Sequence, residues 1–422
     1  MKKLFVTALI GFFLVSVFAI NQEYVDTSSR PAWVPDEIII KYTPSVSVIQ
    51  KKIIENTYGL LKKGENNKNG NFVVLKHKEP AAILERLKKE PGVAYAEQNG
   101  YVYMAMPNTN DQYCFYQWNM VKINMPAAWE ISKGTGAIVA VIDTGIKQSL
   151  ADFADTHFMA GYDFVNLDNN PVDDHGHGSH VCGTIAQSTN NNVGVAGIAY
   201  GCTIMPVKVL DANGCGTYDK IADGIIYAAD NGAHIINLSL GGGAYSITLQ
   251  NAVDYAWGKG CLIVCAAGNS VVSTPIYPAA YTHSFSVAAT NYNDRQAAYS
   301  NYGVMVDIAA PGGDTVDWDG CGYPEGILQG TFGTSGDGYY FHTGTSMACA
   351  HVSGLAALLK SQGPERTNAQ IRSIIEVSAV DLGTPGWDTI YGWGRINAYA
   401  ALTYTSPTPT PSTPPTQRIP TS

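Results

Sequence analysis

Three polar residue types that together perform acyl transfer lie at the ends of apolar runs in this chain. Asp143 ends the run AIVAVID, His177 begins a helical pattern in DDHGHGSH, and Ser346 precedes a long apolar stretch in GTSMACAHVSG. A serine hydroxyl is a poor nucleophile until a base removes its proton, and an imidazole that acts as this base must be oriented by a carboxylate. The three residue types therefore predict hydrolysis through a serine nucleophile, provided that the fold brings them together.

The residues around Ser346 favour the same chemistry. Gly344, Thr345 and Ala348 are small, which leaves room for the backbone of a substrate. A helix that begins at Ser346 would present unpaired N–H groups and a partial positive charge beside the reacting carbonyl. We therefore expect Ser346 at the amino end of a helix over residues 346–363.

Short apolar strands alternate with helical patterns between residues 107 and 405. Strands are predicted at 137–143, 203–210, 234–240, 261–268, 284–290 and 306–312, and helices at 218–232, 247–260 and 346–363. Near-continuous apolar strands separated by helices indicate an α/β fold, with a mostly parallel central sheet and helices on both faces. Chemistry in such sheets gathers at the carboxyl ends of the strands, where Asp143 and Asn269 lie. Residues 313–342 are expected to form a loop near these ends.

Together these stretches resemble the subtilisin family of serine endopeptidases (subtilases), most closely its thermitase-like branch, over residues 110–403. The order Asp, His, Ser along the chain is that of subtilisin. The resemblance implies that Asp143 orients His177, that His177 acts as general base and then as general acid, and that Ser346 attacks the peptide carbonyl. It also implies that Asn269 donates a hydrogen bond to the oxyanion.

Other interpretations of these motifs fit less well. DTG also occurs in aspartic proteases, but those need two such motifs or a dimer, and this chain has one. His175, His177 and His180 could form a metal cluster, yet the sequence has no HExxH, and Ser346 lies in GxSxA rather than in the GxSxG of α/β-hydrolases. Two rival functions stay open: a subtilisin-like binding protein without turnover, and a hydrolase of small esters or peptides.

Two segments match those that pair with an extended peptide in the family, namely LSLGG at 238–242 and the triplet Gly214, Cys215 and Gly216. Such backbone pairing tolerates many sequences, while side-chain pockets add preference. The pocket for the residue before the cut is expected to be walled by Ser239, Leu240, Gly241, Ala267 and Gly268. Ile276 matches the position that floors this pocket, so we expect a preference for small to medium apolar side chains.

Oxygen-rich segments are similar to the calcium sites of the family. Ligands of a first site are expected from Asp111, Asp152, Thr189, Asn191, Val193 and Val195. A mixed set of carboxylate, amide and carbonyl oxygens suits Ca²⁺ better than a transition metal. The segment that holds Asp163 and Asp168 resembles a second calcium site of the family. Calcium is therefore the expected structural cofactor.

Composition divides the chain into four parts. Residues 1–19 have the layout of a cleaved secretory signal, with two lysines, an apolar stretch and then small residues. Residues 20–106 are a lysine-rich α+β segment that resembles the family's inhibitory propeptide. Residues 107–405 are the expected catalytic domain, and the Pro/Thr-rich residues 406–422 are an extended tail.

Charge and processing indicate which partners to expect. Residues 20–106 carry a net charge of +2 and residues 107–422 carry −13, so the larger part has no basic patch for nucleic acid. The expected partners are protein or peptide substrates and the chain's own propeptide, for a secreted, extracellular monomer without membrane contact after signal removal. The maturation cut is expected between Tyr103 and Asn110. Eight cysteines permit disulfides without defining their pairing.

Overall fold

The computed structural model describes residues 15–16, 20–24, 33–62, 72–100, 109–242, 244–318 and 323–405. Most of the predicted signal, the predicted tail and most of the predicted maturation region lie outside these residues. The chain divides into two compact units, a smaller one built mainly from Asp26–Met104 and a larger one that holds most of the rest. Each unit has its own hydrophobic core.

The smaller unit is an antiparallel sheet with two helices. Its strand order is β4-β5-β3-β6, formed by β3 (Trp33–Tyr42), β4 (Leu61–Lys62), β5 (Val73–Lys76) and β6 (Val93–Gly100), and its helices are α1 (Val48–Thr57) and α2 (Pro80–Leu87). Ser47 and Gln50 start α1 with a capping box, in which each side chain accepts a hydrogen bond from the other's backbone N–H. Ile38, Ile40 and Leu75 are fully buried in the core. The predicted α+β architecture of this segment is confirmed.

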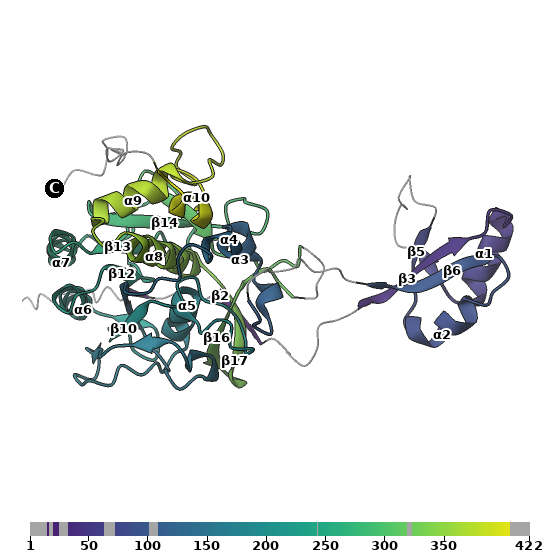
Figure 1. The fold of residues 1–422 in the computed structure, drawn as a ribbon, viewed down its shortest axis with the longest axis horizontal. Helices are drawn as coiled ribbons and strands as arrows, with labels where there is room; N and C mark the ends of the chain where they lie inside the picture. Colours follow the sequence, from purple (N-terminus) through teal and green to yellow (C-terminus); the bar gives the residue numbers. More distant parts are fainter. Residues whose placement is uncertain are drawn as a thin grey trace, which may run out of the picture. The chain divides into compact units, whose positions relative to one another are not determined.

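A parallel sheet forms the centre of the larger unit (Figure 1). Its strand order is β15-β14-β13-β12-β7-β10-β8, with β9 also paired to β10, and every pair is parallel. The strands are β7 (Ile138–Asp143), β8 (His157–Phe158), β9 (Tyr162–Asp163), β10 (Thr203–Lys208), β12 (Ile235–Leu238), β13 (Leu262–Ala266), β14 (Ser284–Thr290) and β15 (Ile308–Pro311). The predicted parallel α/β sheet is confirmed.

Helices cover both faces of this sheet. One face carries α5 (His177–Ala186) and α8 (Thr345–Gln362), and the other carries α6 (Tyr218–Asp230) and α7 (Ile247–Gly258). Val139 and Val141 of β7 pack in the first core, whereas Ala140 and Ile142 pack in the second. Because successive side chains of a strand point to opposite faces, a continuous apolar strand supplies both cores at once.

A β-hairpin precedes α8, where the sequence had been expected to form a loop. Its strands are β16 (Ile327–Gly333) and β17 (Gly336–Thr343), and they pair antiparallel through a turn at Thr334 and Ser335, directly before Gly336, whose φ is +95°. The loop prediction for 313–342 is therefore wrong over the hairpin, because two strand-forming runs flank a short turn with a glycine on either side. On its other edge β17 pairs with β2 (Ile20–Tyr24).

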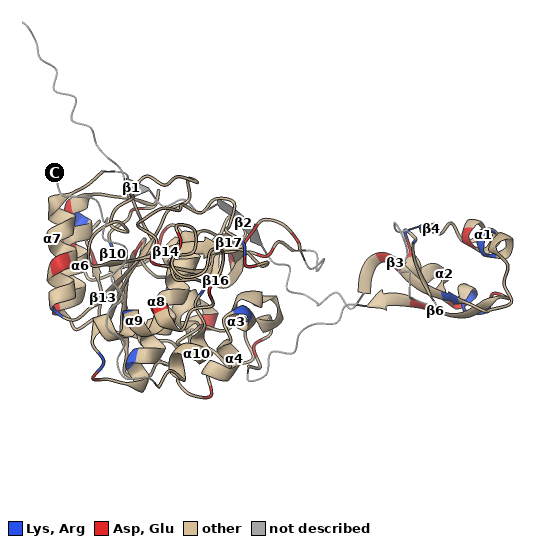
Figure 2. Ribbon diagram, turned by 90° about the horizontal axis from the view of Figure 1, so that it is seen from above, with Lys and Arg blue, Asp and Glu red and all other residues tan. Residues whose placement is uncertain are grey.

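Shorter elements complete the larger unit. They are η1 (Cys114–Tyr116), α3 (Trp118–Lys122), α4 (Met125–Ala128), η2 (Ala151–Phe153), α9 (Asn368–Val377), α10 (Ala398–Leu402) and a pairing of β1 (Val15–Ser16) with β11 (Cys215–Gly216). Within the described residues, no helix combines the length and the apolar character that a membrane crossing requires. Lys and Arg residues are interspersed with Asp and Glu on this unit (Figure 2).

Candidate active site

Asp143 and His177 form a hydrogen-bonded pair where β7 ends and α5 begins. Nδ1 of His177 lies 2.7 Å from Oδ1 of Asp143, and both side chains are fully buried. The backbone N–H of Thr144 donates to the same Oδ1 at 2.7 Å. When a neutral imidazole donates its Nδ1–H to a carboxylate, its Nε2 is unprotonated and can accept a proton. Nε2 of His177 forms no hydrogen bond with any described residue.

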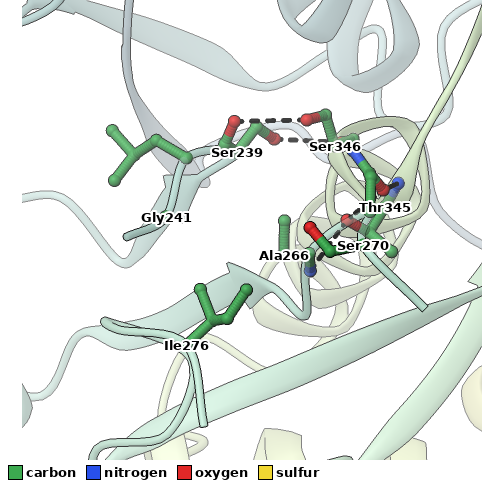
Figure 3. A pocket seen from close by; sticks show the side chains of 10 residues that line it. Ser239, Gly241, Ala266, Ser270, Ile276, Thr345 and Ser346 are labelled. Atoms are coloured by element: carbon green, nitrogen blue, oxygen red, sulfur yellow. Dashed lines mark hydrogen bonds between the residues drawn. The ribbon is translucent and has the colours of Figure 1, made fainter. Parts of the chain in front are cut away.

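Ser346 lies in the first turn of α8, beside Ser239 (Figure 3). Its Oγ donates to the carbonyl of Ser239 at 3.2 Å, and Oγ of Ser239 donates to the carbonyl of Ser346 at 2.9 Å. On the sheet, Asn237 of β12 is paired with Val141 of β7. Two residues further along, Ser239 and Asp143 therefore follow neighbouring strands, which are about 4.8 Å apart in a sheet. The structure thus brings Ser346 to the edge of the sheet where Asp143 lies.

The hydroxyl of Ser346 bonds to Ser239 and not to His177 in this structure. A serine Oγ moves between staggered positions by rotation about one bond. Hydrogen bonds between catalytic groups are often long or poorly aligned before a substrate binds. The serine–imidazole hydrogen bond is therefore part of the proposed mechanism rather than an observed contact.

Asn269 follows β13 and is held by the first turn of α8. Its Oδ1 accepts hydrogen bonds from the backbone N and from Oγ1 of Thr345, both at 2.9 Å. Because these bonds fix one end of a planar amide, they also fix the direction of its Nδ2. Asn269 lines the same pocket as Ser346.

A pocket with a cavity volume of about 40 Å³ opens beside Ser346 (Figure 3). Of the predicted wall residues, Ser239, Leu240, Gly241 and Gly268 line it. Ala267 does not line the pocket, because its side chain packs in a separate cluster with Met305 and Val306, and Ala266 lines the pocket instead. The difference from the expected wall is thus confined to Ala266 in place of Ala267.

Ile276 lies between the two glycine walls of this pocket. A Cβ added at Gly241 would lie 2.8 Å from Cγ2 of Ile276, and one added at Gly268 would lie 2.7 Å from its Cδ1. Any side chain on either wall would therefore collide with Ile276. Conversely, the branched Ile276 side chain limits the depth of a pocket whose walls lack side chains.

The predicted peptide-pairing triplet forms a tight turn and a short strand. Gly214 has a φ of +69°, and Cys215 and Gly216 form β11. In the structure β11 pairs antiparallel with Val15–Ser16 of the same chain. An extended segment thus lies along the edge that the sequence assigned to substrate.

Asp111 and Asp152 are buried close together, with exposed fractions of 3% and 2%. Burial, with a smaller contribution from the charge of Asp111, raises the pKa of Asp152 to about 7, and burial also raises the pKa of Asp111. Neither carboxylate forms an ion pair within the described residues, and Oδ2 of Asp111 has no hydrogen-bond partner there. Buried carboxylates without a basic partner are costly unless a cation compensates them.

The loop that follows residue 188 adds neutral oxygens around this pair. The backbone N–H of Asn191 donates to Asp111 at 3.2 Å, and its Nδ2 donates to Asp152 at 3.0 Å. The carbonyls that accept no backbone hydrogen bond within the described residues include those of Thr189, Val193 and Val195. These hard oxygen donors fit Ca²⁺. Oδ1 of Asn191 accepts from the N–H of Val193 at 2.8 Å, which leaves its second lone pair for a cation.

Asp163 and Asp168 lie opposite each other in a β-bridge. The carboxylate of Asp163 already accepts three hydrogen bonds of 2.7–2.9 Å from Val165 and Asn166, which makes it the anchor of a turn. Asp168 is exposed and accepts from Asn170 at 2.8 Å. A second calcium site at these residues stays a prediction.

The cysteines near the site are buried thiols. Cys182 in α5 and Cys349 in α8 are fully buried, and burial raises the pKa of both thiols well above its ordinary value. Sγ of Cys349 donates to Oδ1 of Asn237 at 3.3 Å. Cys215 is half-buried on the proposed substrate strand. A thiolate is the reactive form of cysteine, so burial protects Cys182 and Cys349 from thiol reagents.

The parallel sheet, the buried Asp143–His177 pair and the serine at the start of α8 together define a serine hydrolase of the α/β class. Comparison with known proteins specifies the family. Residues 134–394 match the subtilase family, and residues 20–99 match the fervidolysin N-terminal prodomain. The chain belongs to the subtilase family and is a subtilisin-like serine endopeptidase with a prodomain.

Individual relatives agree with this assignment. The chain is 42% identical to a thermophilic serine proteinase of Bacillus sp. (strain AK1) over 378 residues, which is 89% of either protein. It is 43% identical to thermitase of Thermoactinomyces vulgaris over 288 residues, 68% of this chain and 96% of thermitase. A solved protease of Pseudoalteromonas arctica PAMC 21717 has a TM-score of 0.64 and 35% identity, covering 70% of this chain and 98% of its own.

Proposed function

We propose that the chain is the precursor of a secreted endopeptidase that cuts proteins through Asp143, His177 and Ser346. In acylation, Nε2 of His177 removes the Oγ proton of Ser346 while Oγ attacks the peptide carbonyl carbon. Asp143 accepts the Nδ1–H bond and stabilises the imidazolium that forms. Nδ2 of Asn269 donates to the oxygen that becomes negative.

His177 then returns the proton to the leaving amine, and the C–N bond breaks to give an acyl-enzyme. In deacylation, a water molecule gives its proton to Nε2 while its oxygen attacks the ester carbonyl, and the proton finally returns to Oγ of Ser346. The start of α8 contributes a partial positive charge at the oxyanion. The imidazole of His177 carries the proton in every step, so the mechanism requires no further titrating group.

The observation that carries this proposal is the buried 2.7 Å contact between Asp143 and His177 at the sheet edge that also holds Ser346. The test is casein digestion by the secreted wild-type protein and by Ser346→Ala, with labelling by a serine-directed phosphonate. We expect the wild type to digest casein and to be labelled at Ser346, and the variant to do neither. A silent binding protein would show no digestion in either sample, and a hydrolase of small molecules would cleave a small ester but not casein.

The shape of the pocket supports a small residue before the cut. A cavity of about 40 Å³ has room for about three waters, since each water needs roughly 10–15 Å³ of such space, so the pocket suits a short side chain better than a long one. Ile276 closes the space into which a longer side chain would extend. We infer that small apolar residues are preferred at this position, and profiling with a peptide library tests it.

Calcium is the proposed structural cofactor at Asp111 and Asp152, with oxygens from Thr189, Asn191, Val193 and Val195. A bound Ca²⁺ would supply positive charge to two carboxylates that are otherwise buried without a basic partner. Its role would be stability, because these residues are not among those assigned to the chemistry. Faster thermal inactivation in a chelator, reversed by added Ca²⁺, tests this assignment.

We propose that residues 20–106 act as an intramolecular inhibitor that the enzyme itself removes. One observation that supports this role is the pairing of Ile20–Tyr24 with β17, which ends at Thr343, three residues before Ser346. An added strand there would cover one side of the site in the precursor. The Ser346→Ala protein is therefore expected to accumulate at precursor mass, and amino-terminal sequencing of the active wild type should begin between residues 103 and 110.

A further inference from the structure

Thr144, the residue after Asp143, is held by hydrogen bonds at every polar atom it has. Its N–H donates to Oδ1 of Asp143 at 2.7 Å. Its Oγ1 donates to Oδ1 of Asp173 at 2.8 Å and accepts from the N–H of Gly178 at 2.9 Å. Its carbonyl accepts from Nζ of Lys208 at 2.7 Å. Since Thr144 is fully buried, these bonds are shielded from water.

Asp173 connects Thr144 to the start of the helix that carries His177. Besides Thr144, Oδ1 of Asp173 accepts from the N–H groups of His175 and Gly176 at 2.9 and 2.8 Å. Its Oδ2 accepts from the N–H and the hydroxyl of Ser179 at 2.8 and 2.6 Å. A carboxylate that binds the N–H groups at a helix start fixes both the position and the direction of the first turn.

Lys208 supplies a buried positive charge on the opposite side of Thr144. Its side chain is 1% exposed, and Nζ also donates to the carbonyl of Leu210 at 2.8 Å and to Oδ1 of Asp174 at 2.7 Å. Lys208 is paired with Asp143 across β10 and β7. Its ammonium therefore ties the loop after Asp143 to the loop that precedes His177.

We propose that the Thr144 network, defined as Thr144, Asp173, Asp174 and Lys208, positions Asp143 against His177. None of the four residues touches the reacting atoms, so they act through Asp143 and through the first turn of α5. Among the described residues, Thr144 is the one that forms hydrogen bonds with Asp143, with Asp173 and with Lys208. Losing its hydroxyl would free the 143–144 loop and the helix start to move apart, which would weaken the Asp143–His177 hydrogen bond. This inference rests on the proposed roles of Asp143 and His177.

The test compares Thr144→Val, which keeps the shape and loses the hydroxyl, with Thr144→Ser, which keeps the hydroxyl. Rates are measured per active site, titrated with a serine-directed phosphonate. We expect Thr144→Val to lower kcat at least 10-fold with KM changed less than threefold, and to shift the acid limb of the kcat/KM profile to lower pH. The shift follows because a weaker bond to Asp143 stabilises the imidazolium less. Thr144→Ser should restore both properties, and Lys208→Met should resemble Thr144→Val.

A matched control is Lys147→Met, which removes a partly exposed lysine of the same loop whose ion-pair partner is Asp337. It should leave kcat and the pH profile unchanged. If Thr144→Val does not mature, the low-field NMR resonance of the His177 Nδ1 proton is compared in full-length Ser346→Ala with and without Thr144→Val, and we expect it to move upfield. A normal kcat per titrated site with an unchanged pH profile, or an unmoved resonance, would overturn the inference. Full activity of Ser346→Ala would instead refute the proposed catalytic serine.

Discussion

Shortening Ile276 should change which residue the enzyme accepts before the cut. Ile276→Ala removes Cγ1, Cγ2 and Cδ1, and two of these atoms point at the glycine walls of the pocket. The opened space should admit an aromatic side chain. Burying a Phe side chain contributes about 1.5–3 kcal/mol, which is about 10- to 150-fold in kcat/KM. We therefore expect the ratio of kcat/KM for Phe over Ala to rise within that range.

The assay uses paired peptides that differ only in Phe or Ala before the scissile bond, each measured with wild type and Ile276→Ala. The ratio of kcat/KM for the two peptides, measured with one enzyme preparation, does not depend on how much of the protein is folded, because the same active sites cleave both peptides. Ile247→Ala is the matched control, since Ile247 is a largely exposed isoleucine at the start of α7. An unchanged Phe/Ala ratio in Ile276→Ala would refute the assignment of Ile276 as the pocket floor.

Three further predictions follow from the site. Asn269→Ala should lower kcat about 10²–10³-fold with little change in KM, as removal of the matching amide does in subtilisin. A rise in KM with kcat unchanged would show a role in substrate binding instead. In chelator, the free energy of unfolding of the Ser346→Ala protein should fall as pH rises from about 4 to about 7, because the folded state retains the Asp152 proton that the unfolded chain releases. Denaturant titrations check this, and either added Ca²⁺ or Asp152→Asn should flatten the pH dependence. Thiol reagents should modify Cys215 before the buried Cys182 and Cys349, and native-state mass spectrometry that found Cys349 labelled first would contradict the described packing.

The sheet could be predicted from the sequence because its strands are buried on both faces. Runs such as AIVAVID are apolar at nearly every position, and in the structure alternate residues of β7 enter different cores. The predicted strand bounds agree with the observed ones to within two residues. The hairpin before α8 was missed because its strands contain glycines at several positions and one strand is partly exposed, which weakens the apolar pattern.

The site was less accessible to sequence reasoning, since it depends on the direction of side chains at strand ends. Ala266 rather than Ala267 lines the pocket because a shift of one residue along a strand turns the side chain to the other face. Lys208 gave no signal, because a lysine near the end of an apolar strand usually places its ammonium group in solvent. Only the folded chain shows that it is buried and donates to two carbonyls and a carboxylate. The oligomeric state and secretion stay predictions.

Ser346 and Ile276 lie in surroundings that differ in how many substitutions they tolerate. Every residue of α8 from Thr345 to Leu359 is buried, so few substitutions are tolerated around Ser346. Ile276 lies outside the regular elements and is only partly buried, so its replacement disturbs few neighbours. Substitution at position 276 can therefore change the substrate preference of descendants of this chain while the residues around Ser346 stay the same.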